Sequence, residues 1–119
     1  MSFVSTETHK IRVFRSEIIA PSGSTFSRWI KLNRSYTGHG VNGRVAGLGT
    51  LTLSYYLSST PLMTDADAQG NIVTGVTDGG ADDPFVKTVA IRPSNYIRFL
   101  ATETSANFIT LTLTFTQVG

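Results

Sequence analysis

The C-terminal stretch Asn107-Phe-Ile-Thr-Leu-Thr-Leu-Thr-Phe-Thr-Gln117 alternates apolar and hydroxyl side chains almost without error. Successive side chains leave a strand on opposite faces, so alternation with period two predicts a strand with one buried side. The same alternation recurs at 50–58, where leucines and Tyr55 alternate with threonine, serine and Tyr56. Two such ribbons need a second layer to cover their apolar faces. The sequence therefore predicts a β-sandwich.

The full expectation is an all-β, antiparallel, two-layer sandwich of jelly-roll or Greek-key type with about seven to eight strands. An N-terminal arm is expected at 1–9 and a single domain at 10–119. A chain of 119 residues is long enough for one domain that buries about two-thirds of its unfolded surface. Further strands are predicted at 10–20, 25–32, 85–92 and 96–104. The longest polar stretch, 60–84, is predicted to be a loop.

Within the 25–32 strand, alternation predicts that Phe26, Ile30 and Leu32 share one face and that Trp29 lies on the other. Trp29 is therefore a candidate for exposure. Together with Tyr36, Tyr55, Tyr56 and Tyr96 it is a candidate member of a sugar-stacking platform.

Composition excludes several classes of function. The chain has no cysteine, so disulfides, thiolate metal sites and cysteine nucleophiles are ruled out. No window approaches the roughly 20 apolar residues of a membrane span, and the net charge of +2 is too small to indicate a nucleic-acid partner. Residues 1–60 carry seven basic and two acidic side chains, whereas 61–119 carry three and six. Such unlike charge suits docking against further copies or another protein.

The segment Gly38-His-Gly-Val-Asn-Gly43 has the glycine spacing of a dinucleotide-binding loop. That motif needs a following helix whose N-terminus receives the pyrophosphate. Here the glycines lead into a predicted strand, so a flexible loop or a bulged strand is favoured. No cofactor is expected.

Asp65, Asp67 and Gln69 imitate the first positions of a calcium loop. The twelfth position, which should be a bidentate glutamate, is Val76, and no flanking helices are apparent. A solvated loop is the favoured interpretation, and these three residues are the metal candidates should it be wrong.

Catalytic residues are not expected. The two histidines are His9, near a terminus, and His39, between glycines, and no nucleophile elbow is present. We therefore expect a protein that is not an enzyme.

The order of motifs from Phe26 to Gln117 resembles small β-sandwich structural proteins of tailed bacteriophages and prophages. The similar segments are Trp29-Ile-Lys-Leu32, Gly49-Thr-Leu-Thr-Leu-Ser-Tyr-Tyr-Leu-Ser58, Ile72-Val73-Thr-Gly75, Ile91-Arg-Pro-Ser-Asn-Tyr-Ile-Arg-Phe99 and Thr102-Glu-Thr-Ser-Ala-Asn-Phe-Ile-Thr110. These are patterns of strands and turns rather than catalytic signatures.

The resemblance implies a virion component, foremost a capsid decoration (cement) protein made in the host cytoplasm and placed on the capsid surface. Its implied partners are the major capsid protein or another virion protein, and further copies of itself, with a trimer among the candidate states. The interface candidates are Phe3, Val4, Trp29, Tyr56, Asp82 and Asp83. The alternative is a carbohydrate-binding or host-attachment module that uses exposed aromatic side chains.

Overall fold

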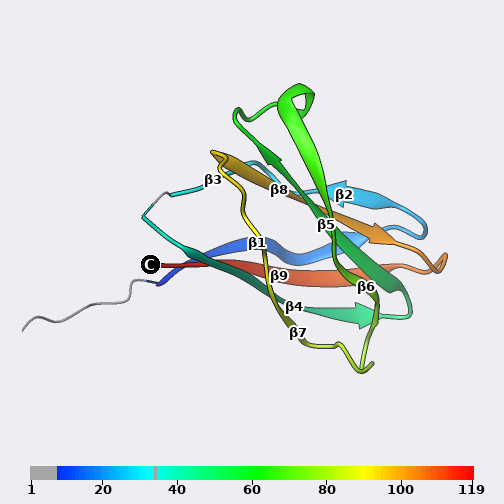
Figure 1. Cartoon of the computed structure of the whole chain (residues 1–119). Coiled ribbons are helices and arrows are strands. Elements are labelled where there is room, and N and C mark those ends of the chain that lie inside the picture. The colour runs from blue at the N-terminus through cyan, green and yellow to red at the C-terminus, as the bar shows by residue number, and fades with distance from the viewer. Residues whose placement is uncertain (1–7, 34) are drawn as a thin grey trace, which may run out of the picture.

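A computed structural model describes residues 8–33 and 35–119 (Figure 1). The described chain is built from nine strands and one short 3₁₀ turn, η1. Their bounds are β1 Thr8–Ile19, β2 Ser24–Phe26, β3 Ile30–Lys31, β4 Gly38–Gly47, β5 Thr50–Ser58, η1 Met63–Asp65, β6 Ala66–Thr77, β7 Phe85–Thr88, β8 Tyr96–Glu103 and β9 Ile109–Val118. No helix in this part of the chain is long and apolar enough to cross a membrane.

The strands form two antiparallel sheets packed face to face, which confirms the predicted sandwich. One sheet has the order β1-β9-β4-β7, and the other has the order β2-β8-β5-β6, with β3 also paired to β8. If β2 and β3 are counted as one interrupted strand, each sheet has four strands. Consecutive strands then alternate between the sheets except for the β5–β6 hairpin, which is the jelly-roll arrangement.

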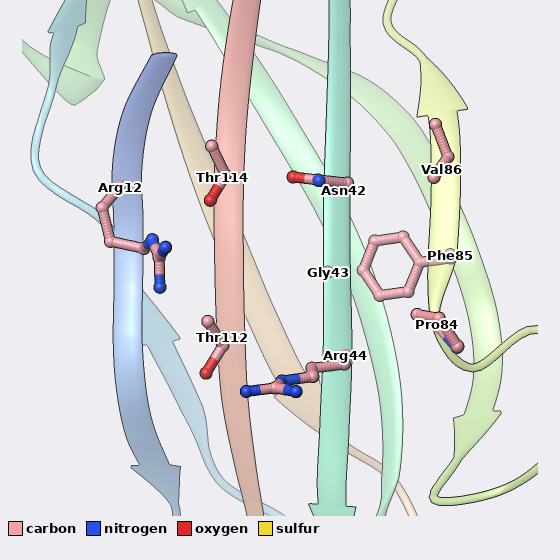
Figure 2. A pocket seen from close by; sticks show the side chains of 9 residues that line it. All are labelled: Arg12, Asn42, Gly43, Arg44, Pro84, Phe85, Val86, Thr112 and Thr114. Atoms are coloured by element: carbon pink, nitrogen blue, oxygen red, sulfur yellow. The ribbon is translucent and has the colours of Figure 1, made fainter.

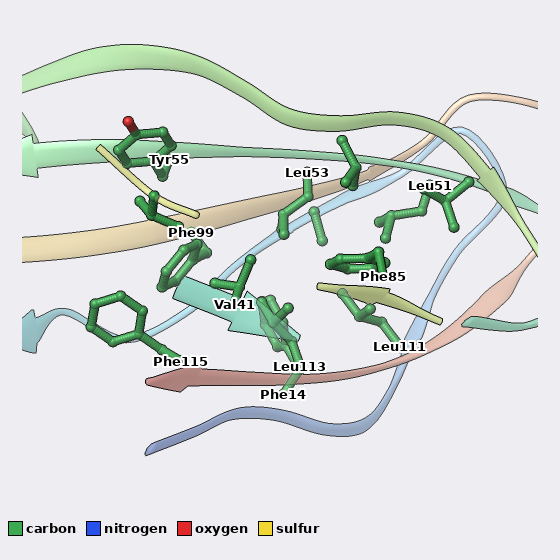
Figure 3. Packing of buried hydrophobic residues seen from close by; sticks show 14 of the residues in the cluster. Phe14, Val41, Leu51, Leu53, Tyr55, Phe85, Phe99, Leu111, Leu113 and Phe115 are labelled. Carbon is green, nitrogen blue, oxygen red and sulfur yellow. The ribbon is translucent and has the colours of Figure 1, made fainter. Parts of the chain in front are cut away.

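The core lies between the sheets and follows the alternation seen in the sequence. On β9, Ile109, Leu111, Leu113 and Phe115 are fully buried, and the threonines between them are half-buried on the outer side. Leu51, Leu53 and Tyr55 of β5 and Phe99 of β8 cover them from the opposite sheet (Figure 3).

The expectation of a loop throughout 60–84 is wrong for about half of that stretch, because residues 66–77 form the long edge strand β6. Its ladder with β5 contains three register shifts, and Gly70 and Gly75 adopt positive φ angles of 100° and 72°. An edge strand has one side open to water, and its bulges interrupt the alternation. A polar, glycine-containing sequence is therefore compatible with a strand here.

The glycine-rich segment after residue 37 forms strand β4. Gly43 pairs with Phe85 of β7, and the Phe85 ring lies against it on the core side (Figure 2). A Cβ atom at Gly43 would lie 2.6 Å from Phe85 Cζ and 3.0 Å from Leu113 Cδ1. The glycine thus makes room for an aromatic side chain that closes the core, rather than for a phosphate group.

We expect Gly43→Ala to destabilise the protein by about 1–3 kcal/mol, because it overpacks the core beneath Phe85. Gly38→Ala on the same strand is the matched control, since its added Cβ would meet no atom nearer than 3.6 Å. Urea unfolding of both variants tests this. Equal stabilities would show that the core absorbs the methyl group.

Glu103 is a buried carboxylate that joins the turns at one end of the sandwich. Its side chain is 1% exposed. Oε1 accepts hydrogen bonds from the backbone N–H groups of Ser22 and Asn107, at 2.9 and 3.0 Å. Oε2 accepts from the N–H of Thr50 at 2.8 Å and from the N–H and hydroxyl of Ser105 at 2.7 and 2.6 Å. The β1–β2, β4–β5 and β8–β9 connections are thereby held to one side chain.

Burial by itself raises the pKa of the Glu103 carboxyl, but hydrogen bonds from the Ser105 hydroxyl and from the backbone of Ser22, Thr50 and Ser105 outweigh it. The net result is a pKa far below the ordinary 4.5. A carboxyl with a depressed folded-state pKa contributes stability that is complete above its unfolded pKa and is lost as the pH falls.

We therefore expect the melting temperature to fall as the pH drops below about 4.5, the ordinary carboxyl value. Glu103→Gln should lower the melting temperature at pH 7, because the new amide turns N–H donors toward N–H donors. The melting temperature of this variant should also decline less steeply below about pH 4.5, because the variant has no carboxyl at this position to be protonated. A variant with the wild-type acid profile would show that another group governs acid unfolding.

Part of the predicted arm falls inside the domain. Thr8 and His9 belong to β1 and pair with Val118 and Gln117 of β9. The rest of the arm, including Phe3 and Val4, lies outside the described residues.

Candidate functional site: the outer faces of the two sheets

The outer face of the β1-β9-β4-β7 sheet carries a row of threonines flanked by arginines. Thr114 on β9 pairs with Arg12 of β1 on one side and with Asn42 of β4 on the other. Thr112 pairs with Arg44 of β4. Because β9 is a central strand, its hydroxyl groups form the floor between the two arginines.

Figure 2 shows Arg12 and Arg44 reaching toward β9 from opposite sides. They flank a shallow groove of about 320 Å³. Its lining residues are Arg12, Asn42, Gly43, Arg44, Pro84, Phe85, Val86, Thr112 and Thr114. A neighbouring hollow of about 470 Å³ extends along the same face and adds Lys10 and Lys87.

Neither hollow is lined by a carboxylate. Within the described chain, the side chains of Arg12 and Arg44 have no hydrogen-bond or ion-pair partner. Two guanidinium groups beside a row of hydroxyls form a donor-rich surface that matches carboxylate oxygens. We call this surface, comprising Lys10, Arg12, Arg44 and the β9 threonines, the basic face.

An exposed apolar tip adjoins the basic face at the end of the sandwich where Glu103 lies. It consists of Ile18, Leu48 and Phe108, whose side chains are 71%, 82% and 54% exposed. Ile18 pairs with Thr110, and the N–H of Gly49, next to Leu48, donates a 3.2 Å hydrogen bond to the Phe108 carbonyl. Exposed apolar groups beside polar and basic ones are typical of protein–protein interfaces.

The outer face of the other sheet carries an aromatic cluster around Arg98. The guanidinium carbon lies 4.2 Å from the ring centroid of Phe26 and 5.4 Å from that of Trp29. Tyr56 pairs with Arg98, and its ring centroid is 6.0 Å from that of Phe26. Two predicted interface residues, Trp29 and Tyr56, are therefore brought together, both half-buried.

The prediction that Phe26 shares a face with Ile30 and Leu32 is wrong, since 42% of the Phe26 side chain is exposed whereas the other two are buried. Strand β2 ends at Phe26, and the chain leaves strand geometry until β3 begins at Ile30. Ser27 is buried in between, and its hydroxyl accepts a 2.9 Å hydrogen bond from the N–H of Phe99. The interruption changes which side chains face the core, while Ile30 and Leu32 share a buried face, in line with the alternation.

The predicted interface pair Asp82 and Asp83 has divided roles. Asp82 is exposed. The carboxylate of Asp83 accepts hydrogen bonds of 3.0 Å from the N–H groups of Val45 and Gly79. Asp83 lies just before β7 begins, and it thus provides an acceptor for the N–H of Val45, a part of β4 that β7 does not reach.

The calcium candidates lie at the start of β6. Asp65 ends η1 and accepts a 2.6 Å hydrogen bond from the Thr60 hydroxyl. Asp67 and Gln69 lie on β6, and the Gln69 side chain accepts from Arg92 Nε at 3.0 Å. No group of three or more acidic or histidine side chains within residues 8–33 and 35–119 is arranged to hold a metal ion.

The histidines are placed beside aromatic rings. His9 stacks on Tyr36 with ring centroids 6.2 Å apart, and His39 stacks on Phe115 at 6.0 Å. His39 Nε2 is buried without a hydrogen-bond partner in the described chain. Burial lowers the pKa of His39, which favours its neutral form.

The sequence reasoning missed two exposed functional candidates, Arg12 and Arg44. Both stand at outward positions of their strands, which is a readable signal, but they belong to strands β1 and β4, which are far apart in sequence. Only the pairing of both strands with β9 brings them together.

No protein-family model and no curated protein matches the sequence. Among solved structures, the fold is similar to the structure of infectious bursal disease virus Gx strain, with a TM-score of 0.61 and 11% identity over 95% of this chain and 32% of that chain. The VP2 subviral particle of infectious bursal disease virus gives a TM-score of 0.60 at 11% identity, with the same coverage. These structural neighbours are viral capsid proteins with a β-sandwich fold.

At this identity the likeness shows the fold alone, and the chain spans about a third of the length of those viral chains. A family two carbohydrate esterase from Cellvibrio japonicus aligns with a TM-score of 0.45 and 12% identity over 97% of this chain and 34% of that chain. That score is too low to support a conclusion about this chain.

Proposed function

We propose that the chain is a non-enzymatic structural protein of a virion, a decoration (cement) protein of the tailed-phage type that docks onto capsid subunits. The observation that carries this proposal is the basic face with its adjoining apolar tip. Together they form an extended exposed surface with cations that have no partner in the described chain. The likeness of the fold to viral capsid proteins supports the same role.

The docking partner is an acidic surface on the shell. Complementary charge accelerates encounter and fixes orientation, whereas burial of an apolar centre slows dissociation. Leu48 and Phe108 would supply that centre, and Arg12 and Arg44 its charged rim. The rigid turns fastened by Glu103 hold the apolar tip in one conformation, so little entropy is lost on docking.

Replacing Arg12 and Arg44 together by glutamate should lower occupancy on empty capsids at least about tenfold, because close like charges cost several kcal/mol at an interface. The matched control is Arg28→Glu with Lys31→Glu, a reversal of two exposed cations at and beside β3 of the opposite sheet. Cosedimentation at two salt concentrations measures both. Equal loss in the two variants would contradict docking through the basic face.

Replacing Leu48 and Phe108 by serine should also release the protein from capsids, but with little change in the salt dependence of the remaining binding. These side chains are exposed, so the fold should be retained, as a thermal melt can verify. Undiminished occupancy would exclude the apolar tip from the interface.

The arm residues Phe3 and Val4 are proposed to contact a neighbouring subunit by strand addition to a sheet edge. Deleting residues 1–7 leaves β1 whole and should reduce capsid occupancy or the formation of homo-oligomers, including a trimer. Light-scattering mass and cosedimentation give both answers. If neither changes, the arm plays no part in assembly.

A second candidate function, the binding of carbohydrate, is favoured by the aromatic cluster around Arg98 on the other sheet.

A further inference from the structure

Arg98 is held in a fixed orientation on the outer face of the β2-β8-β5-β6 sheet. Its guanidinium lies over the rings of Phe26 and Trp29, and its Nε donates a 2.8 Å hydrogen bond to the carbonyl of Ser27. Ser27 is 3% exposed, and its own hydroxyl bonds to the backbone of Phe99 and Arg28. The guanidinium is therefore attached to an anchor that cannot move without disrupting the sheet.

The remaining donors of this group are unused within the described chain. Both Nη groups of Arg98 lack a hydrogen-bond partner there, and so does the hydroxyl of Tyr56, which stands opposite Arg98 on β5. Side-chain entropy is a main cost of binding through arginine. In Arg98 much of this side-chain entropy is already lost on folding, so the Nη edge is preorganised for an acceptor.

The surroundings favour an anion. Residues 24–32, 52–58 and 96–102 form this part of the sheet and contain Arg28, Lys31 and Arg98 but no aspartate or glutamate. The nearest acidic side chain by register is Asp67 on β6, which pairs with Leu57 beyond Tyr56.

We propose that Phe26, Trp29, Tyr56 and Arg98 bind an acidic saccharide, a sugar ring of the uronic acid type. Its carboxylate would pair with the two Nη groups in the bidentate geometry that arginine favours. The C–H face of the ring would pack on an aromatic face, whose negative quadrupole attracts it. The Tyr56 hydroxyl would bond to a sugar hydroxyl.

A saccharide fits this site better than an isolated carboxylate, because the aromatic surface needs an apolar face beside the charge. A uronic acid ring presents both within a single residue. The inference does not depend on docking to a shell, since the basic face belongs to the other sheet.

Calorimetric titration of the intact chain with tetragalacturonate and with its methyl ester tests the proposal without any substitution. The ester keeps the ring and removes the charge. We expect the free acid to bind roughly tenfold tighter or more, the scale of a charge-assisted pair. Equal affinities, or no binding of the acid, would overturn the proposal, as would equally tight binding of tetraglutamate.

Substitutions locate the site. Arg98→Lys keeps the charge but loses the planar fork, and should weaken binding of the acid roughly tenfold. Because Arg98 also braces Ser27, Tyr56→Phe is the second variant; it leaves the arginine stack intact and should weaken binding several-fold. Arg12→Lys with Arg44→Lys, on the opposite sheet, is the control and should bind as wild type. Loss in the control alone would place the ligand on the basic face and refute the assignment.

Discussion

The pairing of β9 with both β1 and β4 is the constraint on which both faces of the first sheet depend. A central strand has neighbours on each side, so each alternate residue is fixed as either core or surface. Along β9, Leu111 and Leu113 point into the core, so Thr112 and Thr114 between and after them point to the outer face. A slip of one residue would bury the threonines and expose the leucines. The same register places Arg12 and Arg44 on either side of the hydroxyl row.

Glu103 complements this constraint at one end of the molecule. Jelly-roll strands are joined mostly by connections that cross between the sheets, and such turns leave backbone N–H groups without ladder partners. A single buried carboxylate accepts hydrogen bonds from four of these N–H groups. The arrangement explains how a turn as exposed as that around Leu48 is held in place: Thr50, two residues on, is fastened to Glu103.

The sequence was informative for β5, β8 and β9, which have neighbours on both sides, but not for β4, which also has two neighbours and whose glycines hide its alternation. The alternation of β5, β8 and β9 predicted their buried faces, and with them the sandwich. Edge strand β6 was not predicted, because one side of it is solvated and bulges interrupt its alternation. Phe26 was assigned to the wrong face because the break at Ser27 leaves no mark in an alternation count. The two arginines of the basic face could be placed outward but not side by side, since strand order depends on non-local pairing.

The two outer faces of a sandwich point in opposite directions, and this geometry relates the two proposed binding surfaces. A chain lying on a shell through Arg12 and Arg44 would turn Arg98 and its aromatic neighbours away from that shell. The two faces share the rigid core but no side chain, so a ligand on one need not displace a partner on the other. The two faces also differ in chemistry. The cations of the basic face, which have no aromatic neighbours, suit a broad acidic surface, whereas the single guanidinium of Arg98 beside its aromatic rings suits one small acidic group. A protein that both adheres to a particle and presents a ligand site outward needs only this separation, which the two-layer fold provides.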